Sequence, residues 1–279
     1  MKRLMFGVIA FMAMIILVGC GGEAEKLAAP KIVATIMDTA SVTVVWEEDT
    51  TVTQHSDFSG YNVYVSTDST VLLSEDGEDL NAHNTTVITT NSYTATNLSK
   101  DSIYYIQVRT VNKDDKVGSY NTSVPFVKAS PRPEFTVTVH LELYPNNQNE
   151  QNCGLRFETG VVTSESLNVF PGADVFFERF ADTLQVNSAS RRTASGFSPR
   201  TTLMKNFGQK HLDSLYQVTP SEIAKDHEPF VVGDLIVFKT EENNYVKLHI
   251  DAYDSTAATV DVTYAYQNKP DFPYFSPGK

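Results

Sequence analysis

Two histidines and a methionine in the second half of the chain have side chains that could ligate a metal ion or haem iron. His211 and His227 flank a segment with helical spacing, and Met204 precedes them. Imidazole nitrogen and thioether sulfur are ordinary ligands of transition metals and of haem. Each histidine also fits a surface position with no ligand, as do His140 and His249. His211 and His227 are therefore weak candidates for a cofactor site.

Two carboxylates, Glu158 and Asp174, could form the acid pair of a glycoside hydrolase. Such a pair needs a separation of about 5 to 10 Å, and any two of the 34 acidic residues could be nominated in the same way. The chain has no Gly-x-Ser-x-Gly elbow, no His-Glu-x-x-His, no glycine-rich phosphate loop and no metal-type Cys/His spacing. We therefore expect no catalytic residue, no metal site and no enzymatic activity.

An acidic run, Glu75-Asp-Gly-Glu-Asp79, could bind calcium through carboxylate oxygens. It lacks the Asp-x-Asp-x-Asp-Gly order of an EF-hand loop, which favours a solvated acidic loop. The formal net charge of the whole chain is −12, and the densest basic pair is Arg191-Arg192. This charge balance opposes binding to nucleic acid, so no nucleic-acid partner is expected.

Alternating apolar residues predict half-buried strands from Pro30 to about Pro131. Trp46 shares one strand face with Val42 and Val44, and Tyr61 shares another with Val63 and Val65. A third run, Tyr104 to Thr110, continues the pattern. Several such strands separated by polar turns predict a β-sandwich.

The same residues resemble a fibronectin type III domain. The matching positions are Pro30, Trp46, Tyr61, Leu98 with Tyr104, Val108, Thr110, Asn112 and Gly118-Ser119. The resemblance implies that Trp46, Tyr61 and Leu98 fill the space between two sheets, and that the Tyr104 hydroxyl binds the backbone at a corner. The polar segment from Thr67 to Asn91 is longer than is usual in this family.

Pro131-Arg-Pro133 predicts a domain boundary, because prolines stiffen a segment and cannot continue a sheet ladder. Beyond it, we expect a second, mainly β domain over 134–270, a tail over 271–279, and one or two short helices between Gly208 and Asp226. Expected strands are Phe135–Leu143, Leu155–Val162, Asp174–Phe180, Leu184–Asn187, Asp234–Thr240, Tyr245–Tyr253 and Thr259–Tyr266. The fold class predicted is all-β, with two β-sandwich domains over 30–131 and 134–270.

Seven aromatic residues of the second domain could form a platform for sugars if some of them faced outward, although alternation along strands favours a core role for most. They are Phe176, Phe177, Phe180, Tyr245, Tyr253, Tyr264 and Tyr266. The runs Gly154–Val161, Ala173–Phe177, Tyr245–Ile250 and Val260–Tyr266 distantly resemble the β-rich, haem-binding HmuY-like lipoproteins. No haem-ligating histidine can be carried over from that family, so the resemblance bears on fold more than on haem.

The chain begins with a short basic segment, an apolar run and Leu17-Val18-Gly19-Cys20. This start resembles a bacterial lipoprotein signal peptide, because the apolar run is short for a membrane-spanning helix. The resemblance implies removal of residues 1–19, lipidation of Cys20, and a lipidated tether over 20–29. Gly21 replaces the aspartate that retains some lipoproteins at the inner membrane, which favours the outer membrane of the cell envelope.

With Cys20 lipidated, Cys153 would remain as a small, partly buried apolar residue outside any disulfide. The function expected is that of a non-enzymatic, membrane-anchored surface or periplasmic lipoprotein, with the fibronectin type III domain as spacer or interaction module. Its ligand would be a protein, a glycan or a small molecule, and no cofactor is required. The alternative is a haem- or metal-binding lipoprotein that passes its cargo to an outer-membrane transporter.

Overall fold

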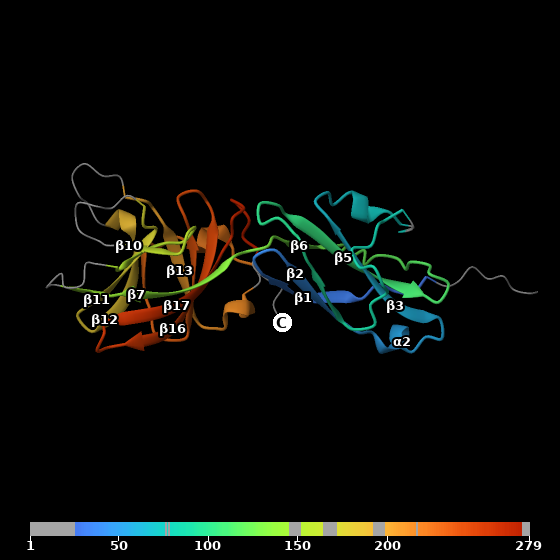
Figure 1. Cartoon of the computed structure of the whole chain (residues 1–279), viewed down its shortest axis with the longest axis horizontal. Coiled ribbons are helices and arrows are strands. Elements are labelled where there is room, and N and C mark those ends of the chain that lie inside the picture. The colour runs from blue at the N-terminus through green and yellow to red at the C-terminus, as the bar shows by residue number, and fades with distance from the viewer. Residues whose placement is uncertain are drawn as a thin grey trace, which may run out of the picture.

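The chain folds into two β-sandwich domains that follow each other end to end (Figure 1). The computed structural model describes residues 26–75, 77, 79–144, 152–163, 172–191, 199–215 and 217–274. The predicted signal peptide, Cys20, the start of the tether and residues 275–279 of the tail lie outside these residues. Within the described ranges, no helix combines the length and the apolar character that crossing a bilayer would need.

Two three-stranded antiparallel sheets form the first domain. The sheets are β1 (Lys31–Met37), β2 (Val42–Glu47) and β4 (Ser92–Ala95), and β3 (Phe58–Ser66), β5 (Tyr104–Asn112) and β6 (Val127–Ala129). The predicted alternation is confirmed, because Val42, Val44 and Trp46 on β2 are all buried. A short helix that the sequence did not predict, α2 (Thr50–Thr53), begins after Asp49, whose side chain accepts a hydrogen bond from the Thr51 N–H.

The core of the first domain lies between its two sheets. The Trp46 and Tyr61 rings pack edge to face with centroids 5.2 Å apart, and Leu98 belongs to the same cluster. The backbone N–H of Ser99 donates a hydrogen bond to the Tyr104 hydroxyl over 2.9 Å. The contacts that the fibronectin type III resemblance implied for these four residues are thus present.

The long segment after β3 covers the outer face of the β3-β5-β6 sheet. It contains a 3₁₀ turn, η1 (Val71–Leu73), and returns along β3, where Ile88 and Tyr61 exchange backbone hydrogen bonds. Leu72 packs with Tyr64 and Val117 in a small cluster outside the main core. The extra length that the sequence showed between Thr67 and Asn91 therefore serves as a cover for this sheet.

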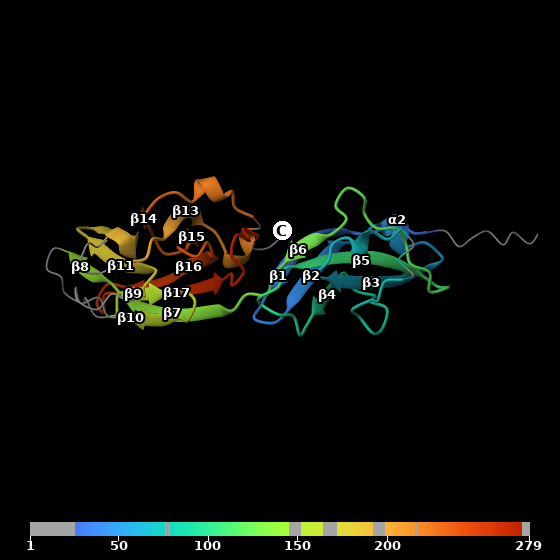
Figure 2. The same ribbon diagram turned by 90° about the horizontal axis from the view of Figure 1, so that it is seen from above.

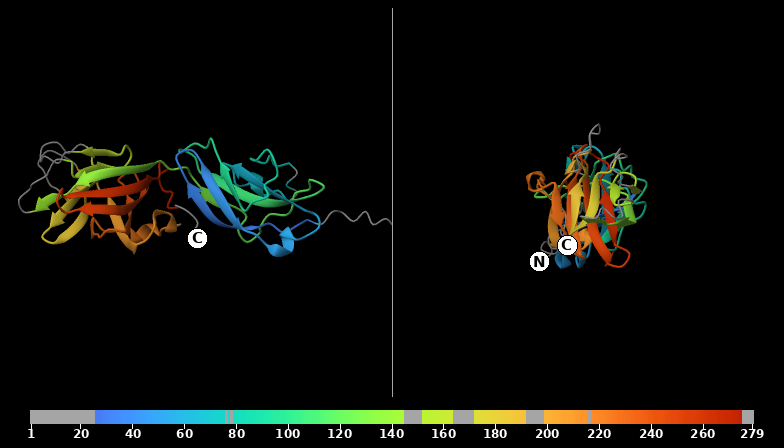
Figure 3. Two further views of the ribbon diagram at one scale, coloured as in Figure 1. Left: turned by 60° about the horizontal axis from the view of Figure 1, so that its bottom comes forward. Right: turned by 90° about the vertical axis from the view of Figure 1, so that its left-hand side faces the viewer.

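The second domain is a sandwich of two larger sheets, which Figures 2 and 3 show from further directions. In the described chain, one sheet has the order β10 (Val161–Thr163), β9 (Gly154–Arg156), β11 (Val175–Phe180), β12 (Thr183–Ser188), β14 (His227–Pro229), with β8 (Glu142–Tyr144) parallel to β11. The other has the order β13 (Leu203–Gln209), β15 (Asp234–Lys239), β16 (Tyr245–Asp254), β17 (Thr259–Tyr266), β7 (Glu134–His140). Buried apolar side chains from both sheets form its core.

Two predicted strands of this domain are each divided in two. The run Phe135–Leu143 becomes β7 and β8, and the Leu141 N–H between them donates to the Ala258 carbonyl. The chain thereby passes from the sheet of β17 to the sheet of β11. The run Leu155–Val162 becomes the hairpin β9 and β10, whose turn contains Gly160 at a φ of +70°.

Strand β13 is absent from the sequence prediction, since a bulge between Asn206 and Gln209 interrupts its alternation. Strand β14 is also absent from it, because three residues carry too little pattern. The helical region between Gly208 and Asp226 consists of two 3₁₀ turns, η3 (Leu212–Ser214) and η4 (Pro220–Glu222), and a third, η2 (Ala189–Arg191), follows β12. The strand predicted at Thr259–Tyr266 has the observed bounds.

Removal of the Tyr104 hydroxyl should destabilise the first domain. We expect Tyr104→Phe to lower its free energy of unfolding by about 1 kcal/mol, because the Ser99 N–H loses its acceptor. Urea denaturation followed by tryptophan fluorescence measures this domain selectively, since Trp46 is the only tryptophan of the chain. Tyr105→Phe is the matched control, because no hydrogen bond of its hydroxyl exists among the described residues. An equal loss in both variants would contradict the prediction.

Candidate functional site

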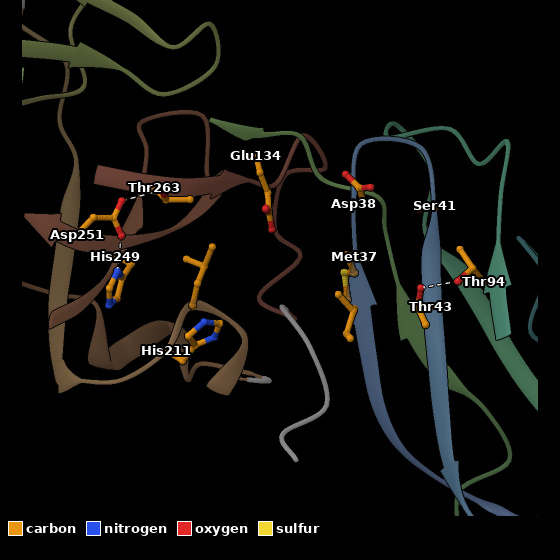
Figure 4. Close-up of a pocket in the computed structure, with 12 residues that line it drawn as sticks. Met37, Asp38, Ser41, Thr43, Thr94, Glu134, His211, His249, Asp251 and Thr263 are labelled. Carbon is orange, nitrogen blue, oxygen red and sulfur yellow. Dashed lines mark hydrogen bonds and ion pairs between the residues drawn. The ribbon is translucent and has the colours of Figure 1, made fainter. Parts of the chain in front are cut away.

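A cleft of about 660 Å³ lies between the two domains (Figure 4). The first domain lines it with the end of β1, the turn into β2, and the adjacent strands β2 and β4. The second domain lines it with the start of β7, the turn η3, and the outer face of β16 and β17. The residues are Ile36, Met37, Asp38, Ser41, Thr43, Thr94, Glu134, His211, Leu212, His249, Asp251 and Thr263. Its volume is within the usual range for small-ligand sites.

The polar wall of this cleft is held by a short chain of hydrogen bonds. Nδ1 of His249 lies 2.6 Å from Oδ1 of Asp251, and the Thr263 hydroxyl donates to the other carboxylate oxygen over 2.7 Å (Figure 4). His249 and Asp251 are two residues apart on β16, and Thr263 is directly opposite His249 on β17. The carboxylate therefore orients the imidazole and leaves Nε2 as the nitrogen for a ligand.

Of the two candidate cofactor residues, only His211 lines the cleft. His227 lies on β14 of the other sheet, where its Nδ1 is 2.8 Å from Asp226 and 3.0 Å from Arg191. The hydrogen bond from His227 lowers the pKa of Asp226. His211 and His227 are thus on separate parts of the domain and do not fit the two ligands of a single haem. The cleft instead brings His211 together with His249.

Other potential ligands are part of the protein interior. Met204 and Cys153 are fully buried, and Met204 belongs to the core of the second domain. Among the residues that the structure describes, no group of three or more His, Cys, Asp or Glu side chains is arranged to hold a metal ion. The described geometry therefore supplies no closed metal site.

Asp174 is bound on both carboxylate oxygens by groups of the protein. Its Oδ1 accepts from Nε of Arg200 over 2.8 Å, and its Oδ2 accepts from the Phe157 N–H over 2.8 Å. Nε of Arg156 lies 3.9 Å from the same Oδ2, and Arg156 also binds the exposed carboxylate of Glu158. These contacts use Asp174 as a structural anchor, which leaves it unsuited to act with Glu158 as a pair of catalytic acids.

The electrostatics of this ion cluster follow from its depth. Burial raises the pKa of Asp174, and its hydrogen bonds with Arg200 and Phe157 oppose that rise. Burial alone would lower the pKa of Arg200, but hydrogen bonds with Glu242 and Asp174 raise it above its ordinary value. Nearby, burial raises the pKa of Tyr266 to about 12. Asp174 and Arg200 therefore stabilise each other's charge inside the domain.

Most of the seven nominated aromatic residues are in the core. Phe176, Phe177, Tyr245, Tyr264 and Tyr266 are buried, which confirms the core interpretation for them. Phe180 is 48% exposed and Tyr253 is half-buried. Of the seven nominated residues, Phe180 and Tyr253 are thus the two whose rings keep exposed surface.

The acidic run at residues 75–79 adjoins a buried arginine of the first domain. The Arg109 guanidinium is fully buried and donates to the carbonyls of Leu72 and Ser74 over 3.0 and 2.7 Å. Burial lowers the pKa of Arg109. Asp76 and Glu78 lie outside the described residues, but Gly77 is so close that a Cβ there would be 2.7 Å from Arg109 Nη1. Gly77 itself is thus buried against the sheet, whereas Glu75 and Asp79 are exposed, as expected for a solvated acidic loop.

Comparison with known proteins identifies the first domain. Residues 28–140 match the fibronectin type III domain family. The match covers all six strands of the first sandwich and continues into β7. The chain therefore contains a fibronectin type III domain within an all-β, multidomain fold.

Solved structures give only weak overall similarity. A titin module from human cardiac muscle is 17% identical, with 35% of this chain and 86% of that chain covered and a TM-score of 0.26. The FN5 domain of Drosophila Lar is 17% identical, with coverage of 38% and 97% and a TM-score of 0.26. A cycloalternan-degrading enzyme from Trueperella pyogenes is 9% identical, with coverage of 86% and 30% and a TM-score of 0.27. No curated protein sequence matches the chain.

Loss of Arg200 should destabilise the second domain strongly. We expect Arg200→Ala to lower its free energy of unfolding by about 3 kcal/mol, because the Asp174 carboxylate, 2% exposed, loses its closest cation. Differential scanning calorimetry measures the effect, while Trp46 fluorescence should show the first domain unchanged. The control is Arg191→Ala, which breaks an exposed pair with Asp226 and should cost less than about 1 kcal/mol. Equal costs would contradict the assigned role of Asp174.

Proposed function

We propose that this protein is a non-enzymatic lipoprotein of the bacterial cell envelope, in which the fibronectin type III domain separates a ligand-binding second domain from the membrane. The observation that carries the proposal is the position of the two ends of the first domain. The Leu27 carbonyl accepts a hydrogen bond from Thr110, near the end of β5. Tyr104, at the start of β5, pairs with Ala129 just before the linker. The chain thus enters at one end and leaves at the other.

This arrangement supports a spacer role. Thr110 at the entry and Tyr104 at the exit are six residues apart on β5, which corresponds to about 20 Å at 3.3 Å per residue. The second domain continues in the same direction, so its far end and the N-terminal side of the first domain are at opposite ends of the molecule (Figure 2). A lipid on Cys20 would attach the first domain to the bilayer and hold the second domain away from it.

Contacts across the junction support a fixed spacing rather than a loose tether. The Arg132 N–H in the linker donates to the Asp38 carbonyl over 2.8 Å, and the Arg132 side chain is buried. Asn268 of the second domain donates to Asp101 of the first. Nζ of Lys128 lies 5.5 Å from the centre of the Tyr274 ring.

Lipidation is tested by labelling the expressed chain with an alkynyl palmitate analogue in a bacterial host. We expect the full chain to take up the label and to sediment with membranes, because the acyl chains anchor Cys20. Cys20→Ser should lose the label and appear in the soluble fraction. Cys153→Ala is the matched control and should keep both the label and the membrane location, since Cys153 is buried. Label retained by Cys20→Ser would refute the proposed anchor.

The second candidate function is that of a haem or metal carrier. The residues that line the cleft favour it. His211 and His249 share the cleft with apolar Ile36, Met37 and Leu212. Asp251 binds the second nitrogen of His249, as carboxylates often do for metal-ligating histidines. The resemblance of the second domain to HmuY-like lipoproteins stays a prediction.

Haemin titration separates the two candidates. A carrier should shift the Soret band of haemin on binding, and His211→Ala or His249→Ala should abolish the shift, because both histidines line the cleft. His227→Ala is the control and should keep it, since His227 lies on β14. No shift with the full chain, or a shift that survives replacement of both cleft histidines, would exclude the carrier function.

A further inference from the structure

A second cavity, an open groove of about 720 Å³, lies at the end of the second domain that is farthest from the first. Tyr253, which lines it, pairs with Val260, and Val260 pairs with Val139 near the far end of β7. The groove therefore opens where the two sheets of the sandwich end. Its other lining residues are Arg179, Asp182, Thr183, Leu184, Asn206, Pro229, Phe230, Val231 and Asp234.

The walls of the groove are fixed by hydrogen bonds within the protein. The Asp234 carboxylate accepts from the Val231 N–H over 3.0 Å and from the Asn206 amide over 2.7 Å. The Phe230 N–H donates to the Leu184 carbonyl over 3.0 Å, which joins the two walls. A ligand would thus meet a site whose shape is already formed.

The floor of the groove is formed by apolar side chains that pack on the core. Phe230 is 4% exposed and packs edge to face on Phe177 with ring centroids 5.9 Å apart. Half-buried Leu184 and Tyr253 both pack against the core. This floor offers contact to a flat apolar face of a ligand.

One charged side chain in the groove has no oppositely charged partner among the described residues. Arg179 is half-buried, and among the described residues its guanidinium has neither an ion pair nor a side-chain hydrogen bond. Asp182, exposed on the neighbouring turn, also lacks both within the described chain. The turn is strained, because Ala181 has a φ of 52°, and such strain often accompanies functional positions. An anion in the groove would give Arg179 the partner that a guanidinium binds best, a carboxylate.

The edge of the sheet beside the groove is unsuited to binding an extended peptide. Strand β14 has three residues and ends at Pro229, which has no N–H to donate. Addition of a peptide strand depends on main-chain hydrogen bonds along such an edge. A compact ligand with its own polar groups fits the site better.

We propose that this groove binds an acidic carbohydrate, with a sugar carboxylate on Arg179, a ring face on Tyr253, and ring hydroxyls on Asp182 and Thr183. A sugar ring combines an apolar face with a rim of hydroxyls, and these match the apolar floor and the polar rim of the groove. The inference rests on the proposed function, because it names the ligand class of the domain that the spacer displays. Lipid anchoring of Cys20 is independent of it.

The test is calorimetric titration of the chain from residue 21 onward, which contains every described residue, with trigalacturonic acid and with neutral galactotriose. We expect the acidic trisaccharide to bind at least tenfold more tightly, because only it places a carboxylate on Arg179. Arg179→Ala should weaken its binding about tenfold or more, and Arg179→Lys should give an intermediate affinity, since lysine keeps the charge but loses the planar fork.

Two further variants complete the design. Tyr253→Ala should weaken binding of the acidic trisaccharide about fivefold through loss of ring contact. Arg191→Ala is the matched control, because Arg191 is a surface arginine outside the groove, and it should bind like the unaltered chain. Equal affinity for the two sugars, no binding of either, or undiminished binding by folded Arg179→Ala would overturn the proposal. Any of these results would leave the Cys20 labelling, and with it the anchored spacer, unaffected.

Discussion

The second domain depends on one buried carboxylate that holds its two sheets together. Asp174 precedes β11 of one sheet and binds Arg200, which precedes β13 of the other. Arg200 also binds Glu242 in the turn between β15 and β16. Because a buried charge is tolerated only with its partners in place, this network restricts how the sheets can be positioned. The mainly apolar core between the sheets supplies the hydrophobic stabilisation but little of this specificity.

The same division of roles is found in the first domain. The apolar cluster around Trp46 stabilises the two sheets, whereas Arg109 fixes the long segment after β3 through backbone carbonyls. A guanidinium suits this task, because its several N–H groups can donate hydrogen bonds to backbone carbonyls that are not paired with a neighbouring strand. In both domains an arginine thus fixes a part of the structure whose position the apolar core does not determine by itself.

Sequence pattern was enough for elements whose residues alternate over a full strand, such as β2 with Trp46 and β17 from Thr259 to Tyr266. It was insufficient where the choice of pairing partner decides which sheet a strand joins. At Leu141 the chain changes sheets although the alternation of apolar residues continues without a break.

The candidate site could be predicted only in part for the same reason. His211 was nominated from its type, but the histidine that shares its cleft is His249, two residues before Asp251 on β16. The signal available in the sequence was the two-residue spacing of His249 and Asp251 on a predicted strand, which puts both side chains on one face. Arg179 belongs to no motif, so only the fold could single it out.

The direction in which the chain crosses the first domain also determines how that domain would respond to pulling. Strand β1 begins near Leu27 at the entry and runs towards the junction, and it is paired with β2 from Lys31 to Met37. A load applied between the tether and a ligand held at the far groove would act along β1 rather than across it. The hydrogen bonds between β1 and β2 would then be sheared together and share the load, instead of opening one after another. Such geometry suits a molecule whose two ends are held by different bodies.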